Sequence, residues 1–174
     1  MTAKEFQKLV TRDESDFLDR FLGVLSSLQI DYCVIGGLAV NAYVEPVVTL
    51  DCDVIVVTSR LPELEEALHA ICKVERFPHS LNLTAPRSDV RIQIQTDKEL
   101  QDCLGRRREA MVLGRTLFVA TPEDLILLKV AAYRESTRRR SKREKDRVDI
   151  IRLVEALPHL TDKLPSEIRS ELKL

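Results

Sequence analysis

The sequence predicts an α/β (α+β) domain with a mixed β-sheet flanked by helices and a helical appendix at its C-terminus. Three observations favour this class. Helical and β-forming patterns follow in the order α-β-α-β-α-β-β, a glycine pair follows the first β-forming run, and the end of the chain is helical in pattern. With 174 residues, 44% of them hydrophobic, we expect one domain over 1–174, with a core at about 13–120 and the helical part at about 121–174.

The first half of the chain alternates between helical and strand patterns. Apolar residues at helical spacing, a proline at a first helical position and β-forming runs define them. The expected elements are a helix over Asp13–Leu28, a strand over Tyr32–Ile35, a helix over Leu38–Tyr43, a strand over Cys52–Val57, a helix from Pro62 to about Cys72, and strands over Ser80–Thr84 and Val90–Gln95. The last two alternate with a period of two, so we expect them to be neighbours in one sheet.

The second half predicts a hairpin and then helices. Two β-forming runs, Glu109–Leu113 and Thr116–Ala120, flank Gly114-Arg115. A helix with Thr121 as its cap should follow and run to about Tyr133. Residues 134–147 hold eight Arg or Lys against three acids, which favours a basic loop before an apolar helical pattern resumes at Val148.

Composition limits the partners and the location of the protein. The formal charge of -1 and the pI near 6.3 exclude a surface that is basic throughout, so affinity for a polyanion requires a local patch. The run Arg138–Arg143 is either a solvated loop or such a patch, for an RNA acceptor or an acidic partner. We expect a cytoplasmic protein without a membrane partner, because no stretch approaches the roughly 18 to 20 apolar residues that span a bilayer. The four cysteines are expected to be reduced core residues.

Two carboxylates and two glycines form the candidate site. Asp51 and Asp53 lie two residues apart in a predicted strand, so both side chains face the same way. Their oxygens suit Mg²⁺, which usually binds through one or two carboxylates plus substrate phosphates. Gly36 and Gly37 lie between a strand and a helix, where backbone N–H groups can approach an anion. Alone, either pattern also fits chance or a tight turn, but together they predict a site for Mg²⁺ and a phosphate group.

This combination resembles the signature of the nucleotidyltransferase superfamily, as in DNA polymerase beta and the minimal nucleotidyltransferases. The matching residues are Ile35-Gly36-Gly37-Leu38 and, after thirteen residues that follow Gly37, Asp51-Cys52-Asp53-Val54. The second half is similar to the AbiEii-type bacterial nucleotidyltransferases in Pro122-Glu123-Asp124-Leu125, Lys129 and Lys145-Asp146-x-x-Asp149-Ile150.

The resemblance implies a role for each matching residue. Asp51 and Asp53 would bind Mg²⁺, Gly36 and Gly37 would hold phosphate, and Lys129 would reach the nucleotide phosphates. Lys145, Asp146 and Asp149 would brace or complete the site, although Lys145 and Asp149 also fit an i, i+4 pair on a solvated helix face.

The sequence departs from the family pattern at one position. Active members carry a third carboxylate on a later strand, whereas the strand over Val90–Gln95 presents Arg91 and Gln93 on its polar face. Asp89 has the right parity to be the third catalytic carboxylate but lies at the edge of that strand. Arg91 would either neutralise the aspartates or grip a nucleotide phosphate.

Two functions are favoured, ahead of a metal-dependent phosphoesterase that would use the same acids and that the resemblance to transferases supports less. The first is a Mg²⁺-dependent nucleotidyltransferase that transfers a nucleoside monophosphate from a nucleoside triphosphate to a hydroxyl of RNA or protein. The second is a noncatalytic module of the same fold that binds a nucleotide or a cognate small protein, as in one half of a toxin–antitoxin-like pair.

Overall fold

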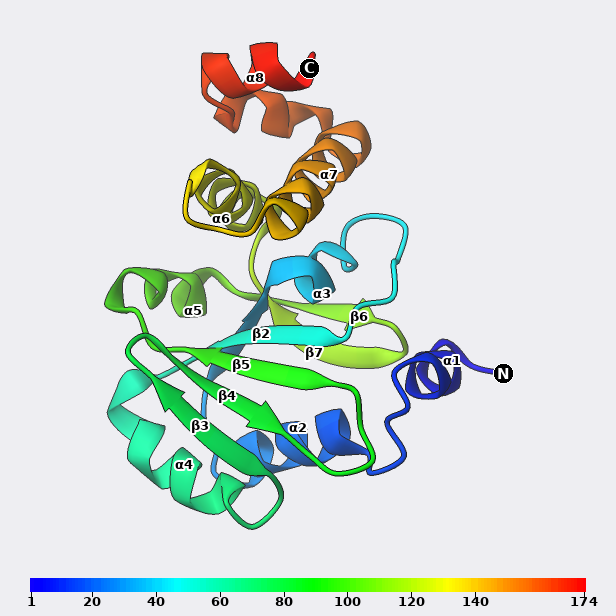
Figure 1. The fold of residues 1–174 in the computed structure, drawn as a ribbon, viewed down its shortest axis with the longest axis vertical. Helices are drawn as coiled ribbons and strands as arrows, with labels where there is room; N and C mark the ends of the chain where they lie inside the picture. The colour runs from blue at the N-terminus through cyan, green and yellow to red at the C-terminus, as the bar shows by residue number, and fades with distance from the viewer.

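The structure is a computed structural model that describes residues 1–174, and its centre is a seven-stranded mixed sheet (Figure 1). The strands are β1 (Tyr32–Ile35), β2 (Asp51–Val56), β3 (Lys73–Phe77), β4 (Ser80–Thr84), β5 (Arg91–Gln95), β6 (Arg108–Val112) and β7 (Arg115–Val119). Their order across the sheet is β3-β4-β5-β2-β1-β7-β6. β1 is antiparallel to β2 and parallel to β7, and β2 is parallel to β5, so the predicted mixed sheet is confirmed.

The helices divide into one set along the sheet and another at its end. The first set is α1 (Ala3–Val10), α2 (Phe17–Ser27), α3 (Gly36–Val40), α4 (Leu61–Leu68) and α5 (Asp102–Arg106), and the second is α6 (Pro122–Arg134), α7 (Arg140–Ala156) and α8 (Ser166–Leu172). Three short 3-10 helices lie at Thr58–Arg60, Lys98–Leu100 and Pro158–Lys163. In Figure 1, α6 to α8 lie beyond α3, away from α2 and α4. No helix combines the length and apolar character that crossing a bilayer requires.

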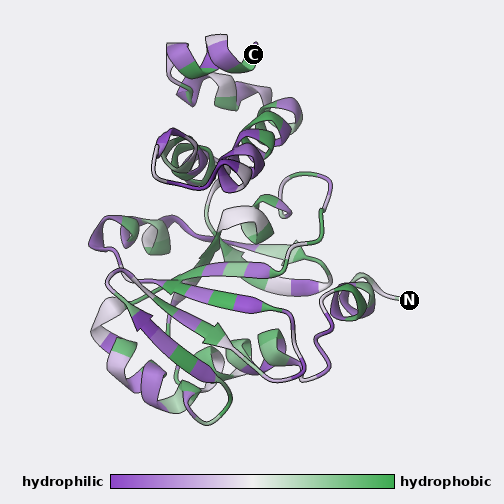
Figure 2. Ribbon diagram, viewed as in Figure 1, coloured by the Kyte–Doolittle hydropathy of each residue, from purple (hydrophilic) through white to green (hydrophobic).

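Alternation along β4 and β5 gives the sheet one apolar and one polar face. Leu81, Leu83, Ile92 and Ile94 are buried in the same hydrophobic cluster as residues of α2 and α4. The residues between them are polar, and Figure 2 shows this alternation along the strands. The cluster holds 39 buried residues and extends into α6, α7 and α8.

Two features of the helices differ from the sequence expectations. The stretch expected to be a basic loop is helical from Arg140, so only residues 135–139 separate α6 from α7. The buried residues nearest the start of α7 are Asp146 and Asp149. Because both are charged, a pattern of apolar residues at helical spacing cannot reveal this part of the helix. Helix α1, strand β3 and helices α5 and α8 were not expected, and β3 is an edge strand with largely exposed side chains.

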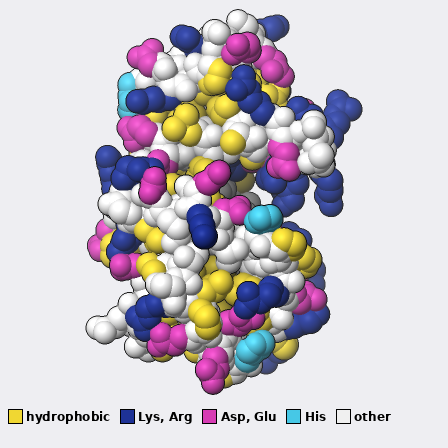
Figure 3. All heavy atoms as spheres, turned by 90° about the vertical axis from the view of Figure 1, so that its left-hand side faces the viewer, with side chains coloured by type: hydrophobic (Ala, Val, Ile, Leu, Met, Phe, Trp, Pro, Cys, Tyr) yellow, Lys and Arg dark blue, Asp and Glu magenta, His cyan; other side chains and the backbone are white.

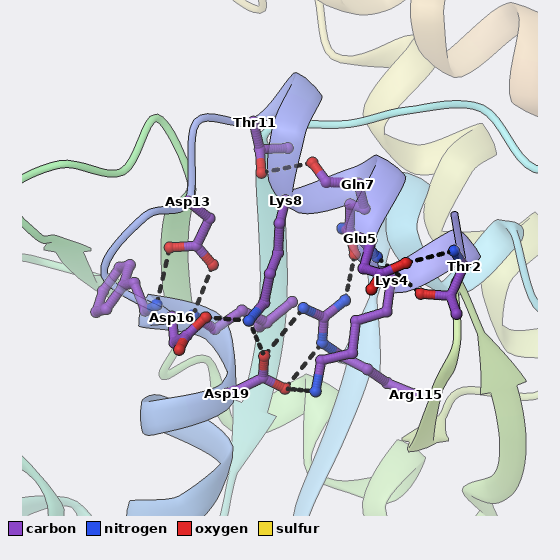
Figure 4. Close-up of polar contacts among 12 residues, drawn as sticks. Thr2, Lys4, Glu5, Gln7, Lys8, Thr11, Asp13, Asp16, Asp19 and Arg115 are labelled. Atoms are coloured by element: carbon purple, nitrogen blue, oxygen red, sulfur yellow. Dashed lines mark hydrogen bonds and ion pairs between the residues drawn. The ribbon is translucent and has the colours of Figure 1, made fainter.

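Helix α1 is joined to the rest of the protein by a polar cluster around Arg115 (Figure 4). The Arg115 side chain is buried, and its Nε and Nη2 donate to the two carboxylate oxygens of Asp19 at 3.0 and 3.1 Å. Its Nη1 donates to Gln7 of α1. At the adjacent turn Gly114 has a φ of +78°, and a Cβ there would lie 3.1 Å from the backbone nitrogen of Lys4.

Removing this guanidinium should loosen α1 and lower stability. We expect Arg115→Ala to reduce the free energy of unfolding by about 2 kcal/mol, because Asp19 and Gln7 lose a buried partner. Urea denaturation measures the change. Arg108→Ala is the matched control, because Arg108 is an exposed arginine on the adjacent strand, and there the loss should stay within about 0.5 kcal/mol. Equal losses in both variants would contradict the assigned role.

Candidate active site

The carboxylate pair lies where the end of β1 meets the start of β2. Ile35 is paired in register with Asp53, so the chain leaves β1 at Gly36 directly beside the Asp53 side chain. Asp51 and Asp53 both line a cleft of about 590 Å³, together with Gly36. Their spacing predicts side chains that face the same way, and both do lie in one cleft next to the glycine turn.

Asp51 is held by two positive side chains. Its Oδ1 lies 2.9 Å from Arg91 Nη2, and its Oδ2 accepts a hydrogen bond from Lys142 Nζ at 3.0 Å. Partial burial works against the ionised form, but Lys142, Arg91 and Lys145 outweigh it and hold the pKa of Asp51 below its ordinary value. Asp51 is therefore an anion that the protein itself already neutralises.

Asp53 lies in the opposite electrostatic environment. Burial, followed by repulsion from Asp51, raises the pKa of Asp53, and the nearby cations offset these effects only in part. Gly36 has a φ of +70°, and a Cβ at this position would overlap Asp53 Oδ2. Glycine is thus needed both for the backbone conformation and to leave room for the carboxylate.

A buried ionic network fixes α7 against α6. Lys129 Nζ lies 3.0 Å from Asp146 Oδ1 and 2.7 Å from Asp149 Oδ2, and all three side chains are at least 88% buried. Arg138 Nε pairs with Asp146 Oδ2 at 2.8 Å, and Arg152 Nη1 pairs with Asp149 Oδ1 at 2.8 Å. Burial alone would lower the pKa of Lys129, but the two aspartates raise it above its ordinary value. Lys129 is thus a cation that holds the helices together.

This network rules out one sequence expectation and gives Lys129 a structural role. A solvated pair between Lys145 and Asp149 does not form, because Asp149 is buried and bonded to Lys129 and Arg152. Lys129 lines the cleft, but its ammonium group is committed to two aspartates, because an ammonium group this buried needs compensating charge.

A second cavity of about 360 Å³ adjoins the carboxylates on the side of α7. It is lined by Gly37, Thr49, Lys145 and Arg152, among others, and shares Asp51, Asp53 and Lys142 with the larger cleft. Figure 3 shows Lys and Arg side chains gathered beside the hollow between the C-terminal helices and the sheet. The carboxylate pair thus lies between two spaces of different composition.

The third carboxylate of the family pattern has no counterpart in the cleft. Gln93 is in register with Asp53 and lines the cleft. Asp89 lies outside the lining of both cavities, next to Arg12 at 3.4 Å, because β5 starts only at Arg91 and Asp89 precedes it. The geometry gives Asp89 no contact with the carboxylate pair.

Lys142 and Arg138 are the site residues that sequence reasoning missed. Both belong to the basic run, and charge alone does not show which of its side chains point into the cleft. Arg138 lies in the connection between α6 and α7, Lys142 lies in the first turn of α7, and both line the cleft.

The donor set fits one magnesium ion and not two. No group of three or more His, Cys, Asp or Glu side chains converges to hold a metal ion. Two aspartates on one strand suffice for a Mg²⁺ ion whose remaining ligands are phosphates and water.

Comparison with solved structures confirms a nucleotidyltransferase-like fold. The antibiotic-resistance factor ANT(2'')-Ia has a TM-score of 0.65 and 16% identity, covering 94% of this chain and 95% of that one. The lincosamide antibiotic adenylyltransferase LnuA, solved with lincomycin bound, has a TM-score of 0.58 and 15% identity, covering 79% and 94%. A nucleotidyltransferase-like protein from Paracoccidioides brasiliensis has a TM-score of 0.54 and 20% identity, covering 99% and 94%.

These identities are low enough that they establish the fold alone. No model of a protein family and no curated protein matches the sequence. The similarity to AbiEii-type proteins stays a prediction.

The two aspartates should affect stability in opposite directions. The pKa of Asp53 is raised, so the stability that its protonated form supplies is lost as the pH rises through the folded pKa. At pH 7 we therefore expect Asp53→Asn to raise the Tm by about 2–4 °C. The pKa of Asp51 is lowered, so its ionised form stabilises the fold above the unfolded pKa, and Asp51→Asn should lower the Tm.

Thermal melts of both variants between pH 4 and pH 8 test this pair. The gain in Asp53→Asn should shrink as the pH falls toward 4, where the wild-type carboxyl also becomes protonated. A lower Tm in both variants at pH 7 would contradict this prediction, because it would show that the ionised Asp53 side chain stabilises the fold.

Proposed function

We propose that the protein is a Mg²⁺-dependent nucleotidyltransferase that transfers a nucleoside monophosphate from a nucleoside triphosphate to an acceptor hydroxyl. One observation carries this proposal. Asp53, a partly buried carboxylate with a raised pKa, lies against the glycine turn at the point where two cavities meet. The fold shared with ANT(2'')-Ia and with the adenylyltransferase LnuA supports it.

The triphosphate is assigned to the smaller cavity. Helix α3, which follows the glycine turn, has only five residues, so its dipole attracts phosphate only weakly. Positive charge comes instead from α7, where Lys145 is exposed in that cavity and Lys142 lies between both cavities. On binding, phosphate oxygens would compete with Asp51 for Lys142, which frees Asp51 to act as a metal ligand.

Asp51 and Asp53 would hold the ion, and Gly37 would let the phosphates approach the backbone. When bound, Mg²⁺ supplies neutralisation of phosphate charge. The acceptor oxygen forms a bond to the α-phosphorus, and the bond from that phosphorus to the α–β bridging oxygen breaks, so pyrophosphate leaves with the bonding electron pair. The hydroxyl proton passes to water, because the position opposite Asp53 holds Gln93 and not a carboxylate.

A noncatalytic nucleotide-binding or protein-interaction module is the second candidate. A specific observation favours it. Arg91 and Lys142 neutralise the charge of Asp51, so this carboxylate needs no metal ion to balance it. Under this reading, a nucleotide or a cognate protein would bind without turnover.

Titration calorimetry with ATP, GTP, CTP and UTP in Mg²⁺ tests the proposal. We expect heat with at least one of them, and stabilisation of about 2.7 kcal/mol at a hundredfold excess over its Kd. Asp53→Asn should weaken binding at least tenfold, because it removes a metal ligand. The matched comparison is Asp89→Asn, which changes an aspartate outside both cavities and should bind like the wild type. Absence of binding with all four nucleotides would contradict the proposal and favour a protein-interaction module.

Gln93→Asp should accelerate transfer by about tenfold or more, because a carboxylate in register with Asp53 could accept the hydroxyl proton or hold a second ion. Transfer of α-labelled nucleotide to RNA, protein and small hydroxyl compounds is the measurement. Thr116→Asp is the control, because Thr116 is exposed on β7 outside both cavities. Labelling lost in Asp89→Asn but kept in Asp89→Glu would instead restore Asp89 as the third carboxylate.

A further inference from the structure

The larger cleft contains a polar face that the phosphate site does not use. Thr84, Asn82, Gln93 and Gln95 lie on the face of β4 and β5 that continues from Asp51 and Asp53, since Asp51 is in register with Arg91 and Thr84, and Asp53 with Gln93 and Asn82. Helices α2 and α4 pack on the opposite face of these strands. The polar face is therefore open to a ligand in the cleft.

One polar atom on this face lacks a partner. The Oδ1 atom of Asn82 is buried and makes no hydrogen bond, although Gln93 beside it donates to Ser80 Oγ at 3.2 Å. An unsatisfied buried acceptor costs roughly 1–3 kcal/mol, which a ligand donor would recover. Asn82 lines the cleft, so a turn of its amide would bring this oxygen to a ligand hydroxyl.

Apart from Asp53, which the proposed function gives to Mg²⁺, the carboxylates that line the cleft are paired with basic side chains. Glu75 is bonded to Lys73 at 2.8 Å, and Asp51 takes both Arg91 and Lys142. No free carboxylate remains on β3 to β5 for an ammonium group, and the exposed Lys145 lies in the other cavity. The groups left to bind an acceptor are amides and a hydroxyl, which can both donate and accept.

We propose that the polar face of β4 and β5 is the acceptor subsite, and that the acceptor is a small uncharged polyhydroxyl compound such as a neutral sugar. This inference rests on the proposed function for the transfer step, but not for binding. A volume of about 590 Å³ lies within the range of small-molecule sites. Amide pairs such as Asn82 and Gln93 match adjacent hydroxyl groups, and one of these hydroxyls would lie beside the carboxylate pair and take the nucleoside monophosphate, releasing pyrophosphate and a proton.

Binding is tested first without nucleotide. Saturation-transfer NMR with neutral disaccharides should give signals that fall at least tenfold in Asn82→Leu and about threefold in Thr84→Val, a nearly isosteric change that preserves the strand. Thr116→Val is the matched control, because Thr116 is exposed on β7 outside the cleft, and its signals should equal those of the wild type. Thermal melts check that each variant is folded. Disaccharide signals that are absent, or unchanged in both Asn82→Leu and Thr84→Val, would overturn the proposal.

Transfer is tested next by mass spectrometry, with Mg²⁺, the preferred nucleotide and an equimolar mixture of a neutral disaccharide, a polycationic aminoglycoside and a short RNA with free hydroxyl ends. We expect the adduct on the disaccharide, and at least tenfold less of it in Asn82→Leu. An adduct confined to the aminoglycoside or the RNA would overturn the acceptor class while supporting nucleotidyl transfer. Disaccharide binding that depends on Asn82, without any nucleotide binding, would uphold the subsite and contradict the proposed function.

Discussion

Lys129 lies buried between Asp146 and Asp149, and this contact sets the position of the N-terminal half of α7. A buried ammonium group with two carboxylates is stable only in the geometry that satisfies all three, because an unpaired buried charge costs several kcal/mol. The same segment of α7 carries Lys142, so fixing Asp146 and Asp149 also fixes a cation at Asp51. The structural core of the C-terminal part and the charge of the cleft thus depend on one contact.

The two aspartates of the D-x-D pattern differ, although they share a strand and a face. Asp51 is surrounded by Arg91 and Lys142, which stabilise its charge, whereas Asp53 is more buried, and repulsion from Asp51 adds to the effect of burial. The different surroundings follow from register, because Asp53 is opposite Ile35 and Gln93 while Asp51 lies nearer the start of α7. A ligand that brings positive charge to Asp53 therefore gains more there than at Asp51.

The sequence was informative wherever burial was apolar. Strand alternation and the glycine pair located β1, β2, β4 and β5 to within a residue or two, and the parity of Asp51 and Asp53 placed them together. The start of α7 was missed because aspartates, not apolar residues, form its buried face. Lys142 could not be found from charge, because a basic run gives no indication of which members face a cleft until the helix that carries them is known.

Gln93 connects the electrostatics of the cleft to its chemistry. A third carboxylate opposite Asp53 would leave three negative charges beside Arg91 and Lys142, and the added repulsion would require a bound cation to balance it. With glutamine, Asp51 and Asp53 lie beside two cations, so this pair is balanced without a metal, and the polar face of β4 and β5 adds only amides and hydroxyls to Arg91. Glutamine at this position also offers no basic group to accept a proton. The arrangement therefore favours a stable ligand-free protein and uncharged ligands over fast proton transfer.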